Sequence, residues 1–150
     1  MIEVAPIGTV ESTRTEPTDD GWDVVQSSVV LDAGRFTPEA LKGLETFSHA
    51  EIIFWMHGAN EGAEKRRPRG NPAWPETGIF AQRGKDRPNR IGTSVCRILK
   101  IDGLRLTLEG LDAIHGTPVL DIKPWVREFG PRGVTRQPTW ATEIMSKYWR

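Results

Sequence analysis

The sequence has a single cysteine, Cys96, and no excess of either charge, since its 20 acidic side chains balance its 20 basic ones. One cysteine excludes an internal disulfide and is typical of a reducing, cytoplasmic compartment. No apolar run reaches about 18 residues, so we expect no membrane span, and nothing at the N-terminus resembles a secretory signal. These absences indicate a cytoplasmic globular protein. Its 150 residues fit one compact domain over residues 1–150.

Several common catalytic motifs are also missing. There is neither a Walker loop nor a G-x-G-x-x-G turn, and no serine lies in a G-x-S-x-G elbow. His49, His57 and His115 are far apart, and no cysteine or histidine stands at metal-ligand spacing beside them, so no metal site is expected. Cys96 lies in an alternating segment that turns its thiol inward, where a cysteine is usually inert.

Short apolar runs rich in β-branched and aromatic residues predict a mainly β protein. The 11 prolines and 15 glycines separate these runs by long loops. Asp102-Gly103 stands between two alternating segments and predicts a tight hairpin, because the turn needs positive φ. Strands are expected over residues 4–10, 26–32, 50–57, 79–82, 92–101 and 119–122.

Helix signals are few. Thr37 can cap a helix and Pro38 suits its first position, ahead of an apolar stripe at a spacing of three. We therefore expect one helix over residues 37–47 and a second, short one over residues 141–149. The pattern as a whole favours a small β-barrel, or a β-sandwich, with long loops and one or two short helices.

Basic side chains gather in two loops. Residues 64–69 read E-K-R-R-P-R, and residues 78–94 set arginine and lysine beside glycine, proline and Asp86. Such loops are typical of sites for anions, although charge runs are also common on loops that are merely solvated. The candidate substrate- or RNA-binding residues are Lys65, Arg66, Arg67, Arg69, Lys85, Arg87 and Arg90.

Residues 111–125 combine two carboxylates with a cation. Asp112 and Asp121 flank a Gly-Thr-Pro turn, and Lys123 follows in a D-I-K-P strand end. An edge of this kind suits an adenine ring, through backbone hydrogen bonds, or a cationic ligand. The same residues are typical of a structural turn in which an aspartate caps its own backbone, and chemistry alone favours that turn.

Two long motifs stand out in this chain. F-A-Q-R-x-x-x-R-P-N-x-I-G fills residues 80–92, and L-D-A-x-x-G-T-P-V-L-D-I-K-P fills residues 111–124. They are accompanied by P-I-G-x-V at residues 6–10, L-x-G-L-E-x-F-S-H at 41–49 and P-R-x-N at 68–71. Together these segments closely resemble the TsaA/TrmO family, also known as YaeB-like or VirR-like, over residues 5–127.

The resemblance implies an S-adenosyl-L-methionine-dependent methyltransferase on a small β-barrel. Such proteins typically work as homodimers, with the cofactor in a cleft near the subunit interface. Members of the family methylate the exocyclic nitrogen of threonylcarbamoyl-adenosine beside the anticodon of threonine tRNA. The implied cofactor is therefore S-adenosyl-L-methionine and the implied partner is tRNA. A barrel also agrees with the missing Rossmann glycine loop.

The resemblance also assigns residues by position. Arg83 would bind the methionine carboxylate. In-line methyl transfer depends mainly on positioning and needs no metal, and Asp112 or Asp121 would serve as base if the acceptor must lose a proton. The implied cofactor-binding residues are His57, Gly58, Arg83, Val95, Asp121, Ile122, Lys123 and Pro124.

The sequence departs from the family pattern near this pocket. Residues 82–86 read Q-R-G-K-D where relatives have T-R-S, Arg90 replaces a proline, and His115 replaces an aspartate. An acidic segment over residues 13–21 stands where relatives have a P-R-Q cofactor loop. Two alternatives therefore remain: a methyltransferase of another RNA or a small molecule, and a non-catalytic S-adenosylmethionine-binding regulator.

Overall fold

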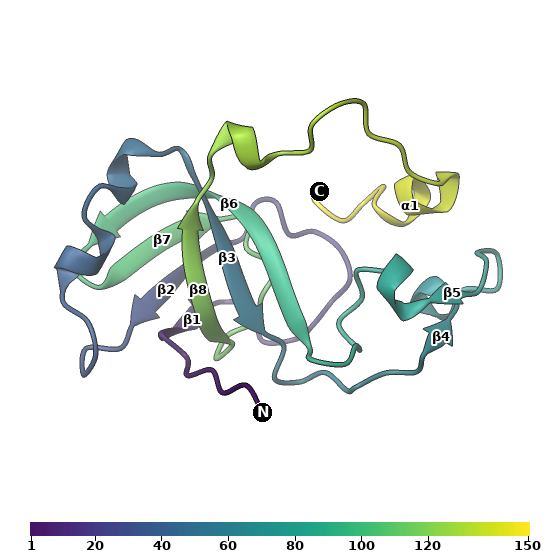
Figure 1. Cartoon of the computed structure of the whole chain (residues 1–150), viewed down its shortest axis with the longest axis horizontal. Coiled ribbons are helices and arrows are strands. Elements are labelled where there is room, and N and C mark those ends of the chain that lie inside the picture. Colours follow the sequence, from purple (N-terminus) through teal and green to yellow (C-terminus); the bar gives the residue numbers. More distant parts are fainter.

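The computed structural model describes residues 1–150, and six antiparallel strands close into a barrel in the order β1-β2-β7-β6-β3-β8 (Figure 1). The predicted small β-barrel is therefore confirmed. The barrel strands are Gly8–Ser12 (β1), Gln26–Leu31 (β2), His49–Trp55 (β3), Ile91–Asp102 (β6), Arg105–Glu109 (β7) and Pro118–Pro124 (β8).

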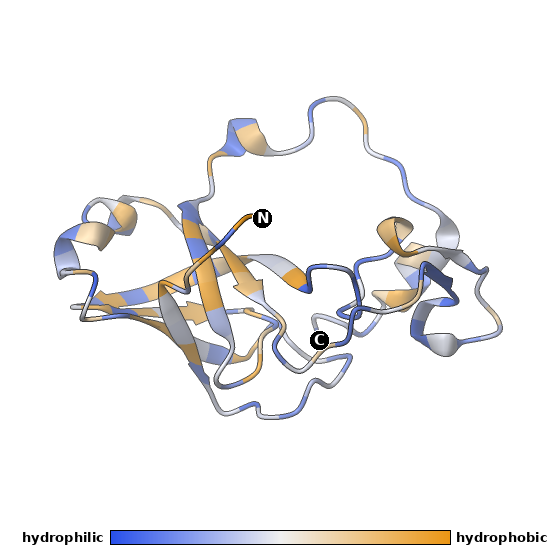
Figure 2. Cartoon of the chain, turned by 60° about the horizontal axis from the view of Figure 1, so that its bottom comes forward, coloured by the Kyte–Doolittle hydropathy of each residue, from blue (hydrophilic) through white to orange (hydrophobic).

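Side-chain alternation places the apolar residues inside the barrel. Along β3, Ala50, Ile52 and Phe54 are buried, while the residues between them are partly exposed. These three belong to a core cluster of 14 buried residues drawn from all six strands and the adjoining loops. Figure 2 shows the same alternation, with orange segments concentrated on the barrel strands.

The predicted hairpin joins the longest strand to its neighbour. Asp102 pairs with Arg105 across the turn, and Gly103 has a φ of 60°, so the Asp-Gly prediction is confirmed. Strand β6 has 12 residues and crosses much of the molecule. It carries Gly92 against the ring of Phe54, where an added Cβ would lie 2.5 Å from Cε2.

A second group of elements lies beside the barrel, on the right of Figure 1. We call it the lobe: residues 57–90 together with α1 (Thr139–Ile144). It contains a short ribbon of β4 (Lys65–Arg66) and β5 (Thr77–Gly78), and 3-10 turns at Pro68–Gly70 and Ile79–Ala81. A hydrogen bond of 2.7 Å from Trp74 Nε1 to Glu143 Oε2 joins α1 to the rest of the lobe.

Two secondary-structure predictions are wrong. Residues 37–47 form two 3-10 turns, Pro38–Leu41 and Leu44–Thr46, rather than one helix, because Gly43 has a φ of 94° between them. The apolar spacing of three is the period of a 3-10 helix, which explains the error. The strand expected over 79–82 is the 3-10 turn Ile79–Ala81, in which Ile79 is buried.

Other elements are displaced at their ends. The first strand begins at Gly8 rather than residue 4, and β3 ends at Trp55, two residues before His57. The C-terminal helix covers Thr139–Ile144 rather than residues 141–149. A fifth 3-10 segment, Arg127–Phe129, follows β8. None of the helices combines the length and the apolar character needed to cross a membrane.

Candidate active site

Strand β6 changes partners along its length, and this exposes one of its edges. Residues 91–97 pair with β3, whereas only residues 97–102 pair with β7. The edge of residues 91–96 that faces away from β3 therefore has no strand beside it. Arg83 reaches this edge, where its Nη2 donates to the Thr93 carbonyl at 3.4 Å. Backbone groups at such an edge are available to a ligand.

Asp112 contacts the same half of β6. Its Oδ1 accepts a hydrogen bond from the hydroxyl of Ser94, a buried β6 residue, and its Oδ2 accepts one from the hydroxyl of Tyr148. Hydroxyl-to-carboxylate bonds are among the stronger protein hydrogen bonds. They join β6, the loop that follows β7, and the C-terminal segment at one point.

Tyr148 is the part of this cluster that the sequence did not reveal. Burial raises the pKa of its phenol, and the charge of Asp112 and the hydrogen bond to it raise that pKa further. The positive charges of Arg83 and Arg69 act in the opposite direction on the same pKa. A strongly perturbed phenol beside a carboxylate and two arginines is typical of a functional site.

Backbone contacts hold Tyr148 in place. The amides of Gly21, Trp22 and Asp23 donate to the carbonyls of Lys147, Tyr148 and Trp149, at 3.2, 2.9 and 2.9 Å. The C-terminal end of the chain thus passes between the barrel and the lobe, as Figure 1 shows. The final residues carry no pattern that marks a functional site. Ser94 ends the basic segment 78–94, but the cations drew attention there rather than the serine, so the sequence offered no specific signal for Tyr148 or Ser94.

The residues expected to bind a cofactor divide between two places. Val95 and Lys123 flank Glu51 on the outer face of the sheet, because both pair with it in register. Asp121 lies on the same face, exposed, with its Oδ2 3.2 Å from Lys123 Nζ and its Oδ1 accepting from the Ile122 amide at 2.9 Å. It is therefore capped by its own strand, as the structural interpretation expects.

The remaining predicted cofactor residues differ in burial and in position. Ile122 packs against the core, so only its backbone can line a site, whereas Pro124 is exposed at the end of β8. His57 and Gly58 are exposed just beyond β3, where the Met56 amide donates to the Arg90 carbonyl at 2.8 Å. The structure brings Arg83 and Asp112 to one cluster and leaves Asp121 on the outer face.

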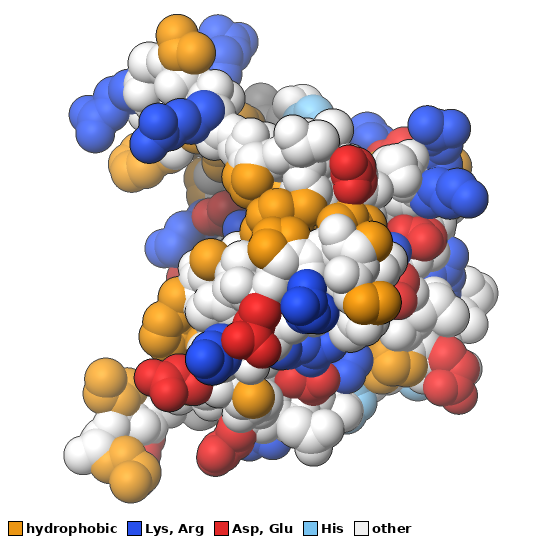
Figure 3. Space-filling view, turned by 90° about the vertical axis from the view of Figure 1, so that its right-hand side faces the viewer, with side chains coloured by type: hydrophobic (Ala, Val, Ile, Leu, Met, Phe, Trp, Pro, Cys, Tyr) orange, Lys and Arg blue, Asp and Glu red, His pale blue; other side chains and the backbone are white.

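The seven candidate RNA-binding cations all make contacts within the protein. Arg67 donates to the Trp74 carbonyl at 2.6 Å and Arg87 to that of Gln82 at 2.8 Å. The others contact Glu76 (Lys65), Asp86 (Arg66 and Lys85), Asp19 and Asp20 (Arg69), and the Ala59 carbonyl and Trp55 ring (Arg90). In Figure 3 the lobe accordingly shows basic, acidic and apolar side chains intermixed.

Arg90 combines an unusual backbone conformation with a contact to an aromatic ring. Its φ is 52°, an uncommon conformation outside glycine, and its guanidinium carbon lies 4.8 Å from the centroid of Trp55. A proline cannot adopt this φ. A proline at position 90 would therefore not fit the backbone that this chain adopts.

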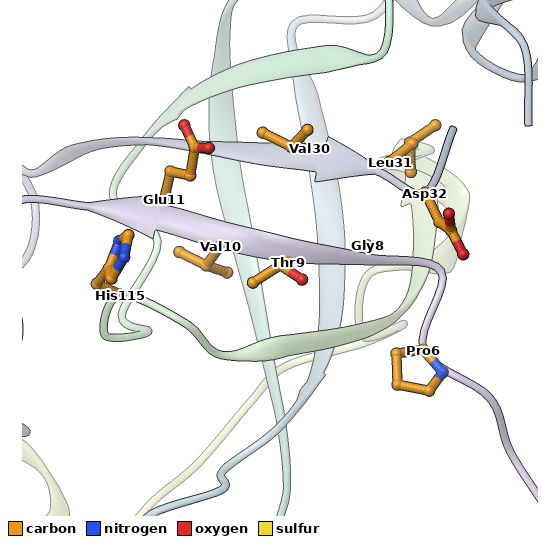
Figure 4. A pocket seen from close by; sticks show the side chains of 9 residues that line it. All are labelled: Pro6, Gly8, Thr9, Val10, Glu11, Val30, Leu31, Asp32 and His115. Atoms are coloured by element: carbon orange, nitrogen blue, oxygen red, sulfur yellow. The ribbon is translucent and has the colours of Figure 1, made fainter. Parts of the chain in front are cut away.

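A separate hollow lies away from this cluster. Figure 4 shows it along β1 and β2, where Gly8, Thr9, Val30 and His115 are among its lining residues. None of the predicted cofactor, catalytic or RNA-binding residues lines it. His115 is fixed there because its Nδ1 accepts from the Ser12 amide at 3.2 Å. No group of three His, Cys, Asp or Glu side chains is arranged to hold a metal ion.

Comparison with known proteins identifies the fold and its relatives. The family model described as the tRNA-methyltransferase O N-terminal domain matches residues 11–130. The chain belongs to this family. A crystal structure of TrmO from P. aeruginosa superposes with a TM-score of 0.76 at 33% identity, and the match covers 93% of this chain and 62% of that one.

The chain covers nearly the whole length of one of the following curated relatives and only part of the other two. A "putative S-adenosylmethionine-dependent methyltransferase" from Pseudomonas aeruginosa is 47% identical over 82% of this chain and 56% of its own length. A "probable S-adenosyl-L-methionine-binding protein" from Methanothermobacter thermautotrophicus is 33% identical over 88% of this chain and 96% of its own. The "tRNA (adenine(37)-N6)-methyltransferase" of Rattus norvegicus is 44% identical over 60% of this chain, which spans 21% of that relative.

Proposed function

We propose that this chain is an S-adenosyl-L-methionine-dependent methyltransferase domain that methylates N6 of an adenosine in tRNA. One observation carries the proposal: the two sequence motifs meet at the open half of β6, where Arg83 from the first and Asp112 from the second both contact that strand. Membership of the tRNA-methyltransferase O family and the functions for which the relatives are named support the same reaction.

The groups around this edge fit the cofactor. The Arg83 guanidinium suits the methionine carboxylate, because arginine binds carboxylates through paired N–H donors. The unpaired edge of β6 offers backbone groups for an adenine. When bound, S-adenosyl-L-methionine supplies a methyl group on a sulfonium centre, and the protein contributes mainly orientation and exclusion of water.

The acceptor nitrogen must release a proton, and Asp112 is the better placed of the two predicted bases. It lies in the cluster with Ser94, Tyr148 and Arg83, whereas Asp121 is exposed and paired with Lys123 at 3.2 Å. Each oxygen of Asp112 accepts one hydrogen bond and keeps a second lone pair, which can take the proton.

Three finer features belong to the same proposal. The adenosine is the threonylcarbamoyl-modified one beside the anticodon, the chain acts in the cytoplasm, and it forms a homodimer. A dimer is supported by exposed apolar residues on β6, where Ile91, Val95 and Leu99 are 43%, 39% and 45% exposed. Val95 is also a predicted cofactor residue, so exposed apolar side chains at this place suit an interface near the site.

A non-catalytic S-adenosylmethionine-binding regulator, or an enzyme for a different acceptor, is the second candidate. The observation that favours it is the engagement of all seven predicted RNA-binding cations by groups of the protein itself. These internal contacts lower the number of cations that are free to bind RNA. Exposed ion pairs are weak and exchange readily, so the same cations can still bind phosphates.

Two measurements separate these possibilities. Isothermal titration with S-adenosyl-L-methionine measures cofactor binding, and nucleoside mass spectrometry measures methyl transfer to tRNA purified with and without the threonylcarbamoyl group. Binding with transfer only to the modified tRNA supports the full proposal. Binding without transfer to any tRNA supports the second candidate, and absence of binding refutes both. Sedimentation velocity tests the dimer.

A further inference from the structure

The segment between β8 and α1 stands away from the body of the molecule. We call residues 126–138 the strap, and Figures 1 and 2 show it as an arch from the barrel to the lobe. Its ends are anchored, since the Trp125 amide donates to the His49 carbonyl at 3.0 Å and α1, which follows the strap, accepts from Trp74 through Glu143 at 2.7 Å. Every residue from 131 to 139 is exposed.

The strap carries cations that have no partner. The side chains of Arg127, Arg132 and Arg136 take part in none of the protein's hydrogen bonds or ion pairs, and Glu128 is the only acidic residue among residues 126–138. The cations of the lobe loops, by contrast, are bound to carbonyls and carboxylates. The guanidinium groups of the strap are therefore free to meet phosphates, whereas those of the lobe loops are engaged.

Exposed apolar side chains alternate with these arginines. Phe129 is 85% exposed and Val134 is fully exposed. The 3-10 segment Arg127–Phe129 closes with the Gly130 amide donating to the Arg127 carbonyl at 3.0 Å, and Pro131 and Pro138 limit the backbone beyond it. An exposed aromatic ring beside unpaired arginines is the combination by which proteins bind single-stranded nucleic acid.

We propose that the strap is an RNA-binding element, in which the three arginines contact phosphates and Phe129 stacks on an unpaired base. This inference rests on the proposed function, because it assigns a binding surface to the tRNA substrate. The gaps of five and four residues between the arginines span at most roughly 18 and 14 Å, so each can reach a different phosphate.

A second copy of the chain is a less suitable partner for this charge. A second copy would have to offer an acidic surface to the strap. The acidic cluster of Asp19, Asp20 and Asp23 is already paired with Arg69 and Arg97. The phosphates of an RNA loop are negatively charged and have no cation of this protein bound to them beforehand. Their binding to arginine also releases counterions, which favours the complex.

The test compares the variant R127Q/R132Q/R136Q with a control of equal charge change, R35Q/K42Q/K100Q, built on exposed cations of the barrel side. Fluorescence anisotropy with a labelled tRNA gives Kd over a range of salt concentrations. We expect the strap variant to bind at least about tenfold more weakly at low salt and to reduce the salt slope by about 2, because each single-strand phosphate contributes about 0.7. The control should change Kd less than about twofold.

Further arms keep the outcome decisive. Phe129→Ala should raise the Kd about fivefold or more, as loss of a stacked base does. Unchanged tRNA affinity in the strap variant, or an equal loss in the control, overturns the strap as the RNA site while leaving the proposed function intact. A wild-type protein that binds cofactor but no tRNA overturns both the strap proposal and the tRNA acceptor. A strap variant that becomes monomeric with unchanged tRNA binding assigns the strap to a second copy and also overturns the proposal.

Discussion

The hydroxyl of Tyr148 donates a hydrogen bond to Asp112, a residue 36 positions earlier in the chain. This contact joins the C-terminal segment to a motif whose other end forms β8, and it occupies one oxygen of the carboxylate that we propose as base. The segment that supplies Tyr148 lies beyond residues 11–130, the part that matches the family. The site therefore combines family residues with a contribution from outside the matched part.

Replacing Tyr148 tests this link. Tyr148→Phe removes one donor from a partly buried carboxylate, so the free energy of unfolding should fall by about 1.5–3 kcal/mol in urea denaturation. Ser146→Ala, in the same segment, should leave it nearly unchanged. In an Asp112→Asn background the effect of Tyr148→Phe should shrink, and equal losses in both backgrounds would show that the two residues are not coupled.

Cys96 predicts a pH dependence. Burial, and to a lesser extent the charge of Asp112, raises the pKa of its thiol from 9.0 to about 12. The unfolded chain therefore loses this proton first as the pH rises, so the free energy of unfolding should fall between about pH 9 and about pH 12. Denaturation of Cys96→Ala across this range should show a shallower decline, and an identical slope would contradict the assignment.

The same thiol should be unreactive in the folded protein. Cys96 is 1% exposed, and near about pH 8 roughly one molecule in ten thousand would carry a thiolate if only its pKa mattered. Labelling with a disulfide reagent should be slow in buffer and rapid in denaturant. Fast labelling of the native protein would show that the barrel opens readily at β6.

Gly92 tests the packing beneath the candidate site. A Cβ at this position would lie 2.5 and 2.7 Å from two ring atoms of Phe54, so Gly92→Ala should cost about 1–3 kcal/mol of stability in thermal or urea unfolding. Gly84→Ala is the matched control, because nothing lies within 4 Å of its added Cβ. Phe54→Leu should relieve part of the cost of Gly92→Ala, and a purely additive double variant would place the strain elsewhere.

Arg83 tests the cofactor proposal directly. Arg83→Ala should weaken S-adenosyl-L-methionine binding about ten- to a hundredfold in isothermal titration, the usual effect of losing a hydrogen bond to a charged group. Arg35→Ala is the control, since Arg35 is also an exposed arginine that donates to a carbonyl, that of Pro6 at 2.8 Å. Equal affinity in both variants would remove Arg83 from the cofactor site.

The segment of residues 37–47 shows which features a local pattern predicts and which it does not. Residues 37–47 carry a cap, a proline and an apolar stripe, yet Gly43 interrupts them with a φ of 94°, so the stripe is divided between two 3-10 turns. The stripe correctly predicted buried residues, since Leu41 and Leu44 are in the core. It did not predict the helix type, because glycine at positive φ lets the chain turn toward the barrel.

In the candidate site, too, the sequence predicted some residues correctly and could not place others. Arg83 and Asp112 could be named in advance because each lies in a long motif, and in the structure both contact β6 from neighbouring loops. Asp121 comes from the same motif as Asp112, but it points outward and pairs with Lys123 at 3.2 Å. Strand alternation and the register of β8 against β3 decide which carboxylate faces the cluster, and neither is a property of the motif itself.

By itself, the sequence determined that the chain forms a small β-barrel, that a tight turn follows Asp102, and which family it belongs to, because these depend on local alternation, turn chemistry and motif order. Only the tertiary structure decided that Tyr148 reaches Asp112, that the lobe cations are bound internally, and that the strap arginines are free. These contacts join residues far apart along the chain. Their geometry depends on how the barrel closes and where β6 loses its partner, which no local pattern records.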